Sequence, residues 1–306
     1  MVKRSHISMS KFTIFVSGSI NLPAKAVVKE LNKHGDKITK LRLGLLPGQT
    51  TLDLVRGYTE AFYVNPSERS TINVALEGVD AAFVWDSEIE EKNHLNDYID
   101  IAMEKGVKHL VVLSAYNTNP PAAEDIEKYI ISKQIPSYTF LRVPFFAHHL
   151  NLYTDSIIKE KVLPLPIGAE GTFSPLDDRD FGEVVATILL ASITENPYNK
   201  MIYTLTGPKL YNGPQLAEKL SIIMNDQIDF RGTSQNEAEA FLIQAISSDL
   251  PNKDQLVKHY LEFYRLIRDG EIGMTTDDVK KILGDEKSPR DIEGYFGEIL
   301  LQTIAT

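Results

Sequence analysis

The sequence predicts an α/β protein, with a doubly wound parallel sheet in its first half and a smaller, mostly helical domain after it. Three observations support this fold class. Apolar strand-like runs alternate with amphipathic helical stretches as far as residue 143, glycines fall near the ends of several of these helices, and the second half is mostly helical in pattern. Such an alternation implies parallel strands whose ligand crevice lies at their carboxyl ends.

The individual elements follow from the same periodicity. Strands are expected at 12–17, 38–46, 61–64, 81–85, 109–114 and 137–143, and helices at 24–33, 68–76, 95–105 and 124–132. After Leu150 the pattern is irregular, and we expect a loop at 162–171, a helix starting at Asp180 and a strand at 201–206. Ser288, Pro289 and Asp291 have the spacing of a helix start, so a last helix should run from there to about Ile304.

Composition limits the function classes. The 306 residues are 43% hydrophobic and carry a formal net charge of -10, which opposes direct contact with nucleic acid or anionic membranes. No segment approaches the length of a membrane-spanning helix. The chain has no cysteine and we find no metal motif, so disulfides and thiolate chemistry are excluded. We expect a cytoplasmic protein, with a nuclear location also open.

Several phrases, in their order and spacing, resemble the NmrA-like family of atypical short-chain dehydrogenases/reductases. They run from about Phe12 to Leu300 and include ALEGVDAAFVW (75–85), EKGVKHLVVLSA (104–115), SYTFLRVPFFAHHL (137–150) and FSPLDDRDFGEVVATILL (173–190). The resemblance implies a Rossmann-like NAD(P)-binding-type domain at 11–153 and 172–206, an α-rich C-terminal lobe at 154–171 and 207–306, and a tail at 1–10. The family includes NADP-sensing co-regulators and NADPH-dependent quinone reductases, so the resemblance does not choose between them.

The phosphate loop departs from the family pattern. Where relatives have TGATGxxG, this chain has Ser17 to Ala24, and only Gly18 remains of the glycines. The lost glycines are those that let backbone approach a pyrophosphate and let the helix pack on the strand. Asn21 places a side chain where the pyrophosphate would lie, and Pro23 has no N–H to offer it, although Pro23 is equally explained as a good first helical residue. We therefore predict a degenerate loop.

The resemblance also names residues that would line the cofactor crevice, namely Gly18, Ser19, Asn21, Leu22, Asn65, Trp85, Ser114, Phe145 and His149. NADP-selective relatives carry a basic residue after the second strand, whereas residues 45–48 carry no charge here. Lys40 and Arg42 lie earlier in that strand. Their side chains either reach around to the cofactor or belong to a solvated strand end. Asn65 stands where relatives have an aspartate close to the adenine, and this difference is compatible with cofactor binding. We expect no cofactor, or weak NADP(H) binding.

No catalytic residue is predicted. Reductases of this class use a Lys, or a Tyr-x-x-x-Lys pair, on the helix after the fifth strand, and Ala123 stands at the position of that lysine. Tyr116 is followed four residues later by Pro120, so the spacing fails there. Tyr129 and Lys133 have the spacing but lie too late in the helix, and helix surface explains them better.

Other residues near the crevice have two interpretations each. His148 and His149 follow the sixth strand, where they either face a pocket or occupy the surface or cap of a helix. Trp85 and Phe145 either fill the crevice or are ordinary core aromatics. Asp180 is expected to be the N-cap of its helix.

The sequence favours a non-catalytic regulatory or scaffold protein that binds a protein partner or a small ligand at the cleft between two lobes. The alternative is an NADPH-dependent oxidoreductase, similar to quinone reductases, with an atypical phosphate loop. A homodimer is left open.

Overall fold

The computed structural model describes residues 11–19, 22–46, 49–50, 54–65, 67–85, 95–115, 122–191, 196–248 and 253–304, so the expected tail lies outside the described residues. One parallel sheet of seven strands dominates this part of the chain, in the order β3-β2-β1-β4-β5-β6-β9. Its strands are β1 (Phe12–Val16), β2 (Ile38–Leu45), β3 (Thr59–Tyr63), β4 (Ala81–Trp85), β5 (His109–Ala115), β6 (Tyr138–Val143) and β9 (Met201–Thr204). The predicted fold class is confirmed.

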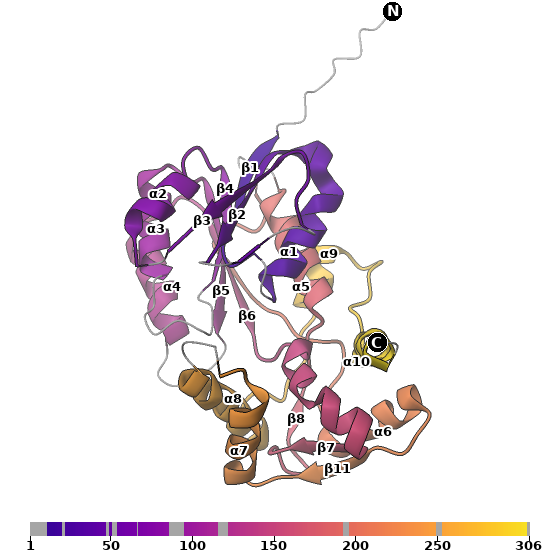
Figure 1. Ribbon diagram of the computed structural model, residues 1–306. Coiled ribbons are helices and arrows are strands. Elements are labelled where there is room, and N and C mark those ends of the chain that lie inside the picture. The colour runs from indigo at the N-terminus through magenta and orange to yellow at the C-terminus, as the bar shows by residue number, and fades with distance from the viewer. Residues whose placement is uncertain are drawn as a thin grey trace, which may run out of the picture.

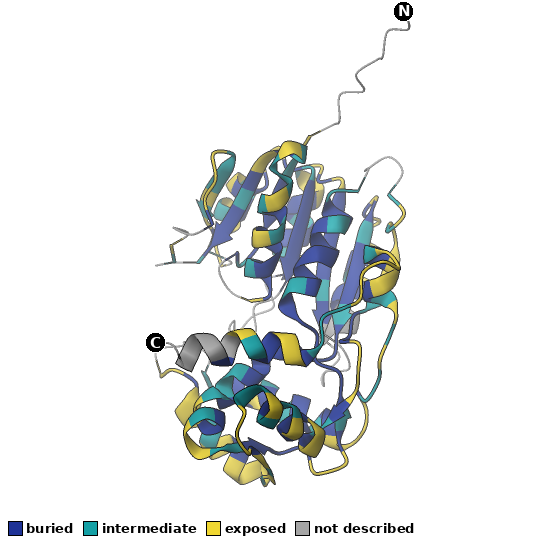
Figure 2. Ribbon diagram, turned by 90° about the vertical axis from the view of Figure 1, so that its right-hand side faces the viewer, coloured by how far each residue is buried: buried dark blue, intermediate teal, exposed yellow. Residues whose placement is uncertain are grey.

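Helices cover both faces of the sheet, as Figures 1 and 2 show. One face packs against α1 (Ala24–Leu31) and α5 (Asp178–Leu189), and the other against α2 (Arg69–Ala75), α3 (Leu95–Glu104) and α4 (Ala122–Ser132). The central strands are apolar on both sides because both faces are covered: all five residues of β4 are buried, whereas the edge strand β3 has only exposed or partly exposed residues. Strand order reverses between β1 and β4, which places a ligand crevice at the carboxyl ends of these two strands.

The connection from α1 to β2 is a 3₁₀ segment, η1 (Asn32–Lys37). Helices α1 and α5 approach each other closely, because a Cβ on Gly182 would lie 2.6 Å from the backbone oxygen of Ala26. The predicted helix-terminal glycines Gly78 and Gly106 have φ values of 68° and 71°, which is the left-handed conformation that ends helices.

A second core forms the C-terminal lobe, below the sheet in Figure 1. Its elements are η2 (Ala147–Tyr153), η3 (Ser156–Glu160), β7 (Val162–Leu165), β8 (Thr172–Phe173), β10 (Tyr211–Asn212), α6 (Gly213–Met224), β11 (Asp229–Gly232), α7 (Gln235–Ala245), α8 (Lys253–Arg268) and α10 (Ile292–Ile304). The short helix α9 (Asp278–Leu283) packs instead on the sheet domain, where Val279 and Ile282 join the core beside α5. No helix in the described part of the chain combines the length and apolarity that crossing a membrane requires.

Three expectations were wrong at element boundaries. The segment expected as a loop contains β7, which pairs in parallel with β11, more than sixty residues later. The helix expected from Asp180 begins at Asp178, and its cap is Asp177, whose side chain accepts a hydrogen bond from the Arg179 amide. Asp180 is buried instead, and accepts hydrogen bonds from the backbone and side chain of Arg290.

This ion pair, in which Asp180 is buried and Arg290 is partly exposed, lies at the third boundary. Because Arg290 is held against α5, residues 288–291 stay outside the last helix, which begins at Ile292. Burial raises the pKa of Asp180, although the charge and the hydrogen bonds of Arg290 act against this. The pair therefore ties the final segment of the chain to the sheet domain at a cost in desolvation.

Candidate functional site

The loop after β1 is held by hydrogen bonds to the neighbouring strands. The amide of Ser17 donates to the Phe83 carbonyl at 3.0 Å, and the amide of Ser19 donates to the Gly44 carbonyl at 3.1 Å. The Ser19 hydroxyl donates back to the Val16 carbonyl at 2.6 Å. Two amides of the loop are thus already bonded within the protein, where a dinucleotide-binding loop needs its N–H groups to face a phosphate.

Trp85, the last residue of β4, packs directly on this loop. Gly18 has φ 58°, and a Cβ built on it would lie 2.9 Å from Nε1 of Trp85 and 3.2 Å from Cε2. The indole N–H donates to the Ser17 carbonyl at 3.0 Å, and the Trp85 amide donates to the Ser17 hydroxyl at 3.2 Å. The ring is 8% exposed. The structure therefore brings Gly18, Ser19 and Trp85 together, with the indole covering the glycine.

The start of α1 gives little to an anion. Pro23 is the residue before the first helical position, not the first one, and its side chain makes no cap hydrogen bond. Ala24, at the position of the family's third glycine, is completely buried, whereas Leu22 is 39% exposed. Asn21 lies outside the described residues.

The basic residues of β2 are paired away from the crevice. Lys40 and Arg42 both form ion pairs with Glu60 on β3, at 2.5 and 3.2 Å. Arg42 also donates to the Ala75 carbonyl at the end of α2. Both side chains therefore have charged partners on the neighbouring outer strand. This supports the interpretation as a strand end, and neither side chain points toward the loop after β2.

Asn65, after β3, organises the start of α2. Its side-chain oxygen accepts from the Ser67 amide at 3.1 Å, and its side-chain nitrogen donates to Glu68 at 3.0 Å. Ser114, near the end of β5, donates to the buried Glu127 of α4 at 2.8 Å, and Glu127 also receives two hydrogen bonds from Arg142. Both predicted site residues thus have bonded partners within the protein. As cofactor contacts they stay a prediction.

The residues after β6 form an aromatic and histidine cluster at the junction of the lobes. The ring of His149 is fully buried, 5.0 Å from that of Phe145, 5.2 Å from that of Tyr260 and 5.3 Å from that of Phe263. The surface interpretation of His149 is therefore wrong. The structure brings the predicted residues Phe145 and His149 into contact, one layer below the crevice.

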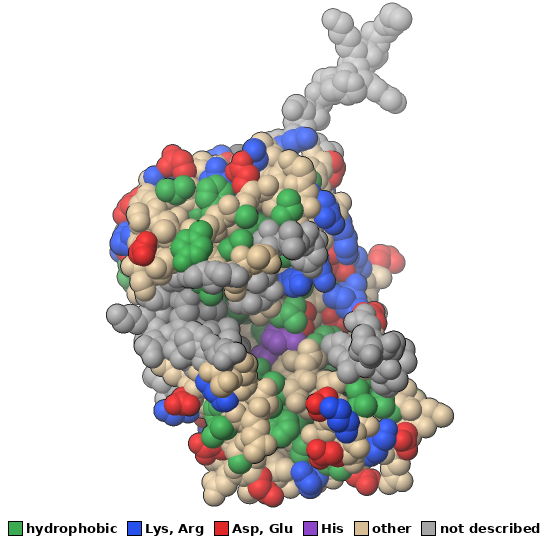
Figure 3. All heavy atoms as spheres, viewed as in Figure 1, with side chains coloured by type: hydrophobic (Ala, Val, Ile, Leu, Met, Phe, Trp, Pro, Cys, Tyr) green, Lys and Arg blue, Asp and Glu red, His purple; other side chains and the backbone are tan. Residues whose placement is uncertain are grey.

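His148 is partly exposed beside this cluster and faces a carboxylate. Its Nδ1 lies 2.6 Å from Oδ1 of Asp178, the first residue of α5, and Phe146 stacks on its ring at 5.2 Å. Figure 3 shows a hollow between the two lobes with histidine side chains at its floor. A ring oriented by a carboxylate can exchange a proton with a bound molecule, so this pair is the candidate acid–base group of the hollow. The sequence pattern did not reveal it, because the two residues are thirty positions apart.

The other catalytic candidates have structural roles or lie outside the described residues. Tyr129 and Lys133 both contact Asp100 on α3, at 2.8 Å, which confirms the helix-surface interpretation. The side chain of Ala123 and all of Tyr116 and Pro120 are not described. Within the described part of the chain, no group of three or more His, Asp or Glu side chains could hold a metal ion.

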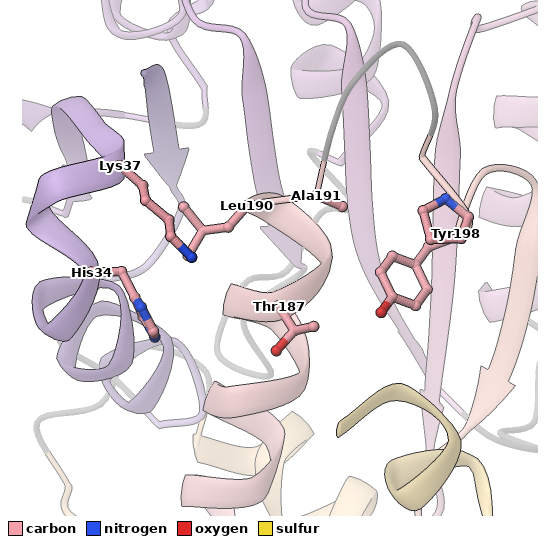
Figure 4. Close-up of a pocket in the computed structure, with 7 residues that line it drawn as sticks. His34, Lys37, Thr187, Leu190, Ala191 and Tyr198 are labelled. Carbon is pink, nitrogen blue, oxygen red and sulfur yellow. The ribbon is translucent and has the colours of Figure 1, made fainter. Parts of the chain in front are cut away.

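A separate pocket of about 390 Å³ opens at the opposite edge of the sheet. Figure 4 shows Lys37 and His34 of η1 on one side, Tyr198 on the other, and Thr187 and Leu190 of α5 between them. Because these residues precede strands or end a helix, the pocket lies away from the carboxyl ends of the strands. Its lining includes charged, polar and apolar side chains.

Taken together, several described residues of the phosphate loop and of β2 depart from the usual dinucleotide-binding arrangement. Two loop amides are bonded to strands, Pro23 has no amide hydrogen, and the indole of Trp85 lies on Gly18. The basic side chains of β2 are paired with Glu60.

Comparison with known proteins adds the fold and a set of relatives. No family model matches the chain, so the NmrA-like resemblance stays a prediction. The sequence is 24% identical to Prestalk A differentiation protein A of Dictyostelium discoideum over 307 residues, covering 98% of this chain and 96% of that protein. It is also 24% identical to the NAD(P)H azoreductase of Xenophilus azovorans over 224 residues, covering 71% and 75%.

Solved structures share the whole architecture. The triphenylmethane reductase of Citrobacter sp. complexed with NADP(H) has a TM-score of 0.76 at 20% identity, covering 94% of this chain and 99% of that one. The NADPH-dependent quinone oxidoreductase of Escherichia coli complexed with NADPH also has a TM-score of 0.76, at 16% identity, covering 95% and 99%. These likenesses show that the chain has the Rossmann-like fold of NAD(P)-binding reductases.

Proposed function

We propose that this protein binds a small ligand or a protein partner in the hollow between its lobes and performs no hydride transfer of its own. The observation that carries the proposal is the state of the phosphate loop. The amides of Ser17 and Ser19 are bonded to neighbouring strands, and Pro23 has none to give. The proline before α1 removes one of the N–H groups that a helix start offers to an anion, which supports weak or absent binding of a dinucleotide.

The hollow supports a binding role. The His148–Asp178 pair lies beside an aromatic cluster that includes Tyr260 and Phe263. A concave site with apolar walls and a few oriented polar groups is the usual form of a ligand site. The likeness to a differentiation protein along almost the whole chain is consistent with a regulatory role.

Titration of the purified protein with NADPH, NADP, NADH and NAD tests the proposal. Calorimetry measures binding directly, and the emission of Trp85, the single tryptophan of the chain, reports on the loop. We expect no binding below millimolar cofactor. Tight and selective binding of any of the four would refute the proposal.

A second candidate is an NADPH-dependent reductase, which the comparisons support better than they support a regulator, since the azoreductase, the triphenylmethane reductase and the quinone oxidoreductase are reductases by name. One observation of this chain favours it. His148, whose Nδ1 lies 2.6 Å from Oδ1 of Asp178, would be the proton donor that the sequence pattern does not supply. The loop would have to rearrange before a cofactor could bind.

Oxidation of NADPH in the presence of quinone or azo-dye acceptors tests this candidate. A reductase would turn over, and His148→Asn would remove a basic limb from the pH profile of kcat while leaving the affinity for NADPH unchanged. The matched control is His34→Asn, which changes a histidine at the opposite edge of the sheet. Absence of turnover with every acceptor, together with absence of cofactor binding, would exclude this second candidate.

A further inference from the structure

The pocket between η1 and the end of α5, here called the edge pocket, is a second binding site. We propose that it binds a small organic monoanion, namely a carboxylate carried on an apolar or aromatic body. Its volume of about 390 Å³ is within the range of small-molecule sites. It lies away from the carboxyl ends of the strands, and therefore away from the hollow of the proposed function, so the two sites do not depend on each other.

The lining of the edge pocket carries positive charge and no negative charge. Lys37 is charged, His34 lies beside it, and none of the seven lining residues is Asp or Glu. Among the described residues, Lys37 has no carboxylate as an ion-pair partner. His34 does contact Glu30, at 3.4 Å, but Glu30 is itself paired with Lys33 at 2.5 Å. A lysine without a counter-charge at a concave surface favours a ligand with one negative charge.

The other lining residues supply a hydroxyl and an apolar wall. Figure 4 shows the Thr187 hydroxyl turned toward the side of α5 on which η1 lies, and the ring of Tyr198 on the other side of the last turn of α5. Leu190, Ala191 and Pro197 contribute only apolar side chains. A carboxylate would therefore meet the lysine and a hydroxyl, while the body that carries it packs on apolar groups.

Hydrogen bonds hold the Tyr198 side of the edge pocket in place. The Tyr198 amide donates to the Asn196 side chain at 2.9 Å, and the Tyr198 carbonyl accepts from the Thr139 hydroxyl at 2.7 Å. The Asn196 side chain also lies 3.2 Å from Nδ1 of His109. Burial raises the pKa of the Tyr198 hydroxyl, so this group is neutral near pH 7 and does not repel an anion. This wall is thus anchored on β5 and β6 before any ligand binds.

Calorimetric titration of the purified protein with benzoate tests the proposal, with benzamide as the neutral molecule of similar shape and acetate as the anion without a ring. We expect benzoate to bind roughly tenfold more tightly than either. Lys37→Met removes the charge and keeps a long side chain, so it should weaken benzoate binding roughly tenfold and leave benzamide binding unchanged. Lys33→Met is the matched control, because Lys33 has the same charge, is close in sequence and does not line the edge pocket.

Filling the space tests the apolar wall. Ala191→Phe places a ring in the edge pocket and should weaken the binding of benzoate, and a melting temperature close to that of the wild-type protein would show that the variant is folded. Undiminished benzoate binding by folded Ala191→Phe would count against this pocket as the site.

Equal affinity of the wild-type protein for benzoate and benzamide would overturn the proposal. Unchanged benzoate binding by Lys37→Met would also overturn it, because Lys37 would then only offset the negative pole at the end of α5. His148→Asn should leave benzoate binding unchanged, and a loss of binding in that variant would assign the anion to the hollow and refute the edge pocket. The cofactor titrations have no bearing on these outcomes, so failure of the proposed function and failure of the edge pocket are told apart.

Discussion

Replacing His109 by Gln should flatten the acid limb of the stability curve. His109 begins β5 and is 1% exposed. Its Nδ1 lies 2.6 Å from the Ser137 hydroxyl and its Nε2 lies 3.2 Å from the Thr139 hydroxyl, and neither partner carries a charge. Burial lowers the pKa of His109 from 6.5 to about 4, so the folded protein holds this ring neutral near pH 7.

The size of the effect follows from that shift. The folded-state pKa is below the unfolded value, so the unfolded chain takes up the proton first as the pH falls. The stability linked to His109 is fully present above about pH 6.5 and is lost between there and about pH 4. A shift from 6.5 to about 4 corresponds to a total loss of about 3 kcal/mol across that window.

Urea unfolding at a series of pH values measures this loss. The free energy of unfolding of the wild-type protein should fall more steeply than that of His109→Gln, by up to about 1.4 kcal/mol per pH unit near the middle of the window. Gln can still hydrogen-bond Ser137 and Thr139, so the variant should fold. Carboxylates and the other histidines titrate in both proteins and cancel in the difference. Parallel curves for the two proteins would refute the assignment of a neutral, buried His109.

Three further predictions concern contacts that hold the elements together. Asp180→Asn should lower the free energy of unfolding by less than about 1 kcal/mol in urea melts, because burial already raises the pKa of Asp180 and Arg290 keeps its hydrogen bond to Glu183; a loss of about 3 kcal/mol would show that the charge of Asp180 stabilises the fold. Gly182→Ala should cost about 1–3 kcal/mol in the same assay, because the added methyl meets the α1 backbone at 2.6 Å, and an unchanged midpoint would contradict that contact. Gly18→Ala should be more destabilising in the wild-type protein than in the Trp85→Ala background, by about 1–3 kcal/mol in a double-mutant cycle, and additive effects would argue against packing of the indole on Gly18.

Periodicity was sufficient for the sheet domain because its strands are short runs rich in apolar residues, and the central ones are buried on both faces. The strand at 81–85 was predicted with its observed ends, and the other predicted strands differ by two residues or fewer. Local pattern failed where the deciding contact is distant in sequence. The strand Val162–Leu165 exists because it pairs with Asp229–Gly232, and the last helix starts late because Arg290 is bound to Asp180.

The candidate site also has one part that the sequence predicts and one part that it does not. The sequence alone shows that glycines are missing from the loop and that position 23 is a proline. The conformational freedom of glycine and the missing N–H of proline do not depend on their neighbours in the fold. The partners of the side chains are not visible. Nothing in the spacing of His148 and Asp178 indicates that they meet at 2.6 Å, and the aromatic surroundings of His149 come from α8, more than a hundred residues later.

Gly18 shows why a surviving motif residue is weak evidence for a surviving function. A glycine retained at the end of β1 would ordinarily be attributed to phosphate binding. Here the φ of 58° is explained by a tight turn alone. The indole of Trp85 also lies where the Cβ of any other residue at position 18 would have to be placed. The packing of Trp85 would therefore preserve this glycine even if no nucleotide ever bound.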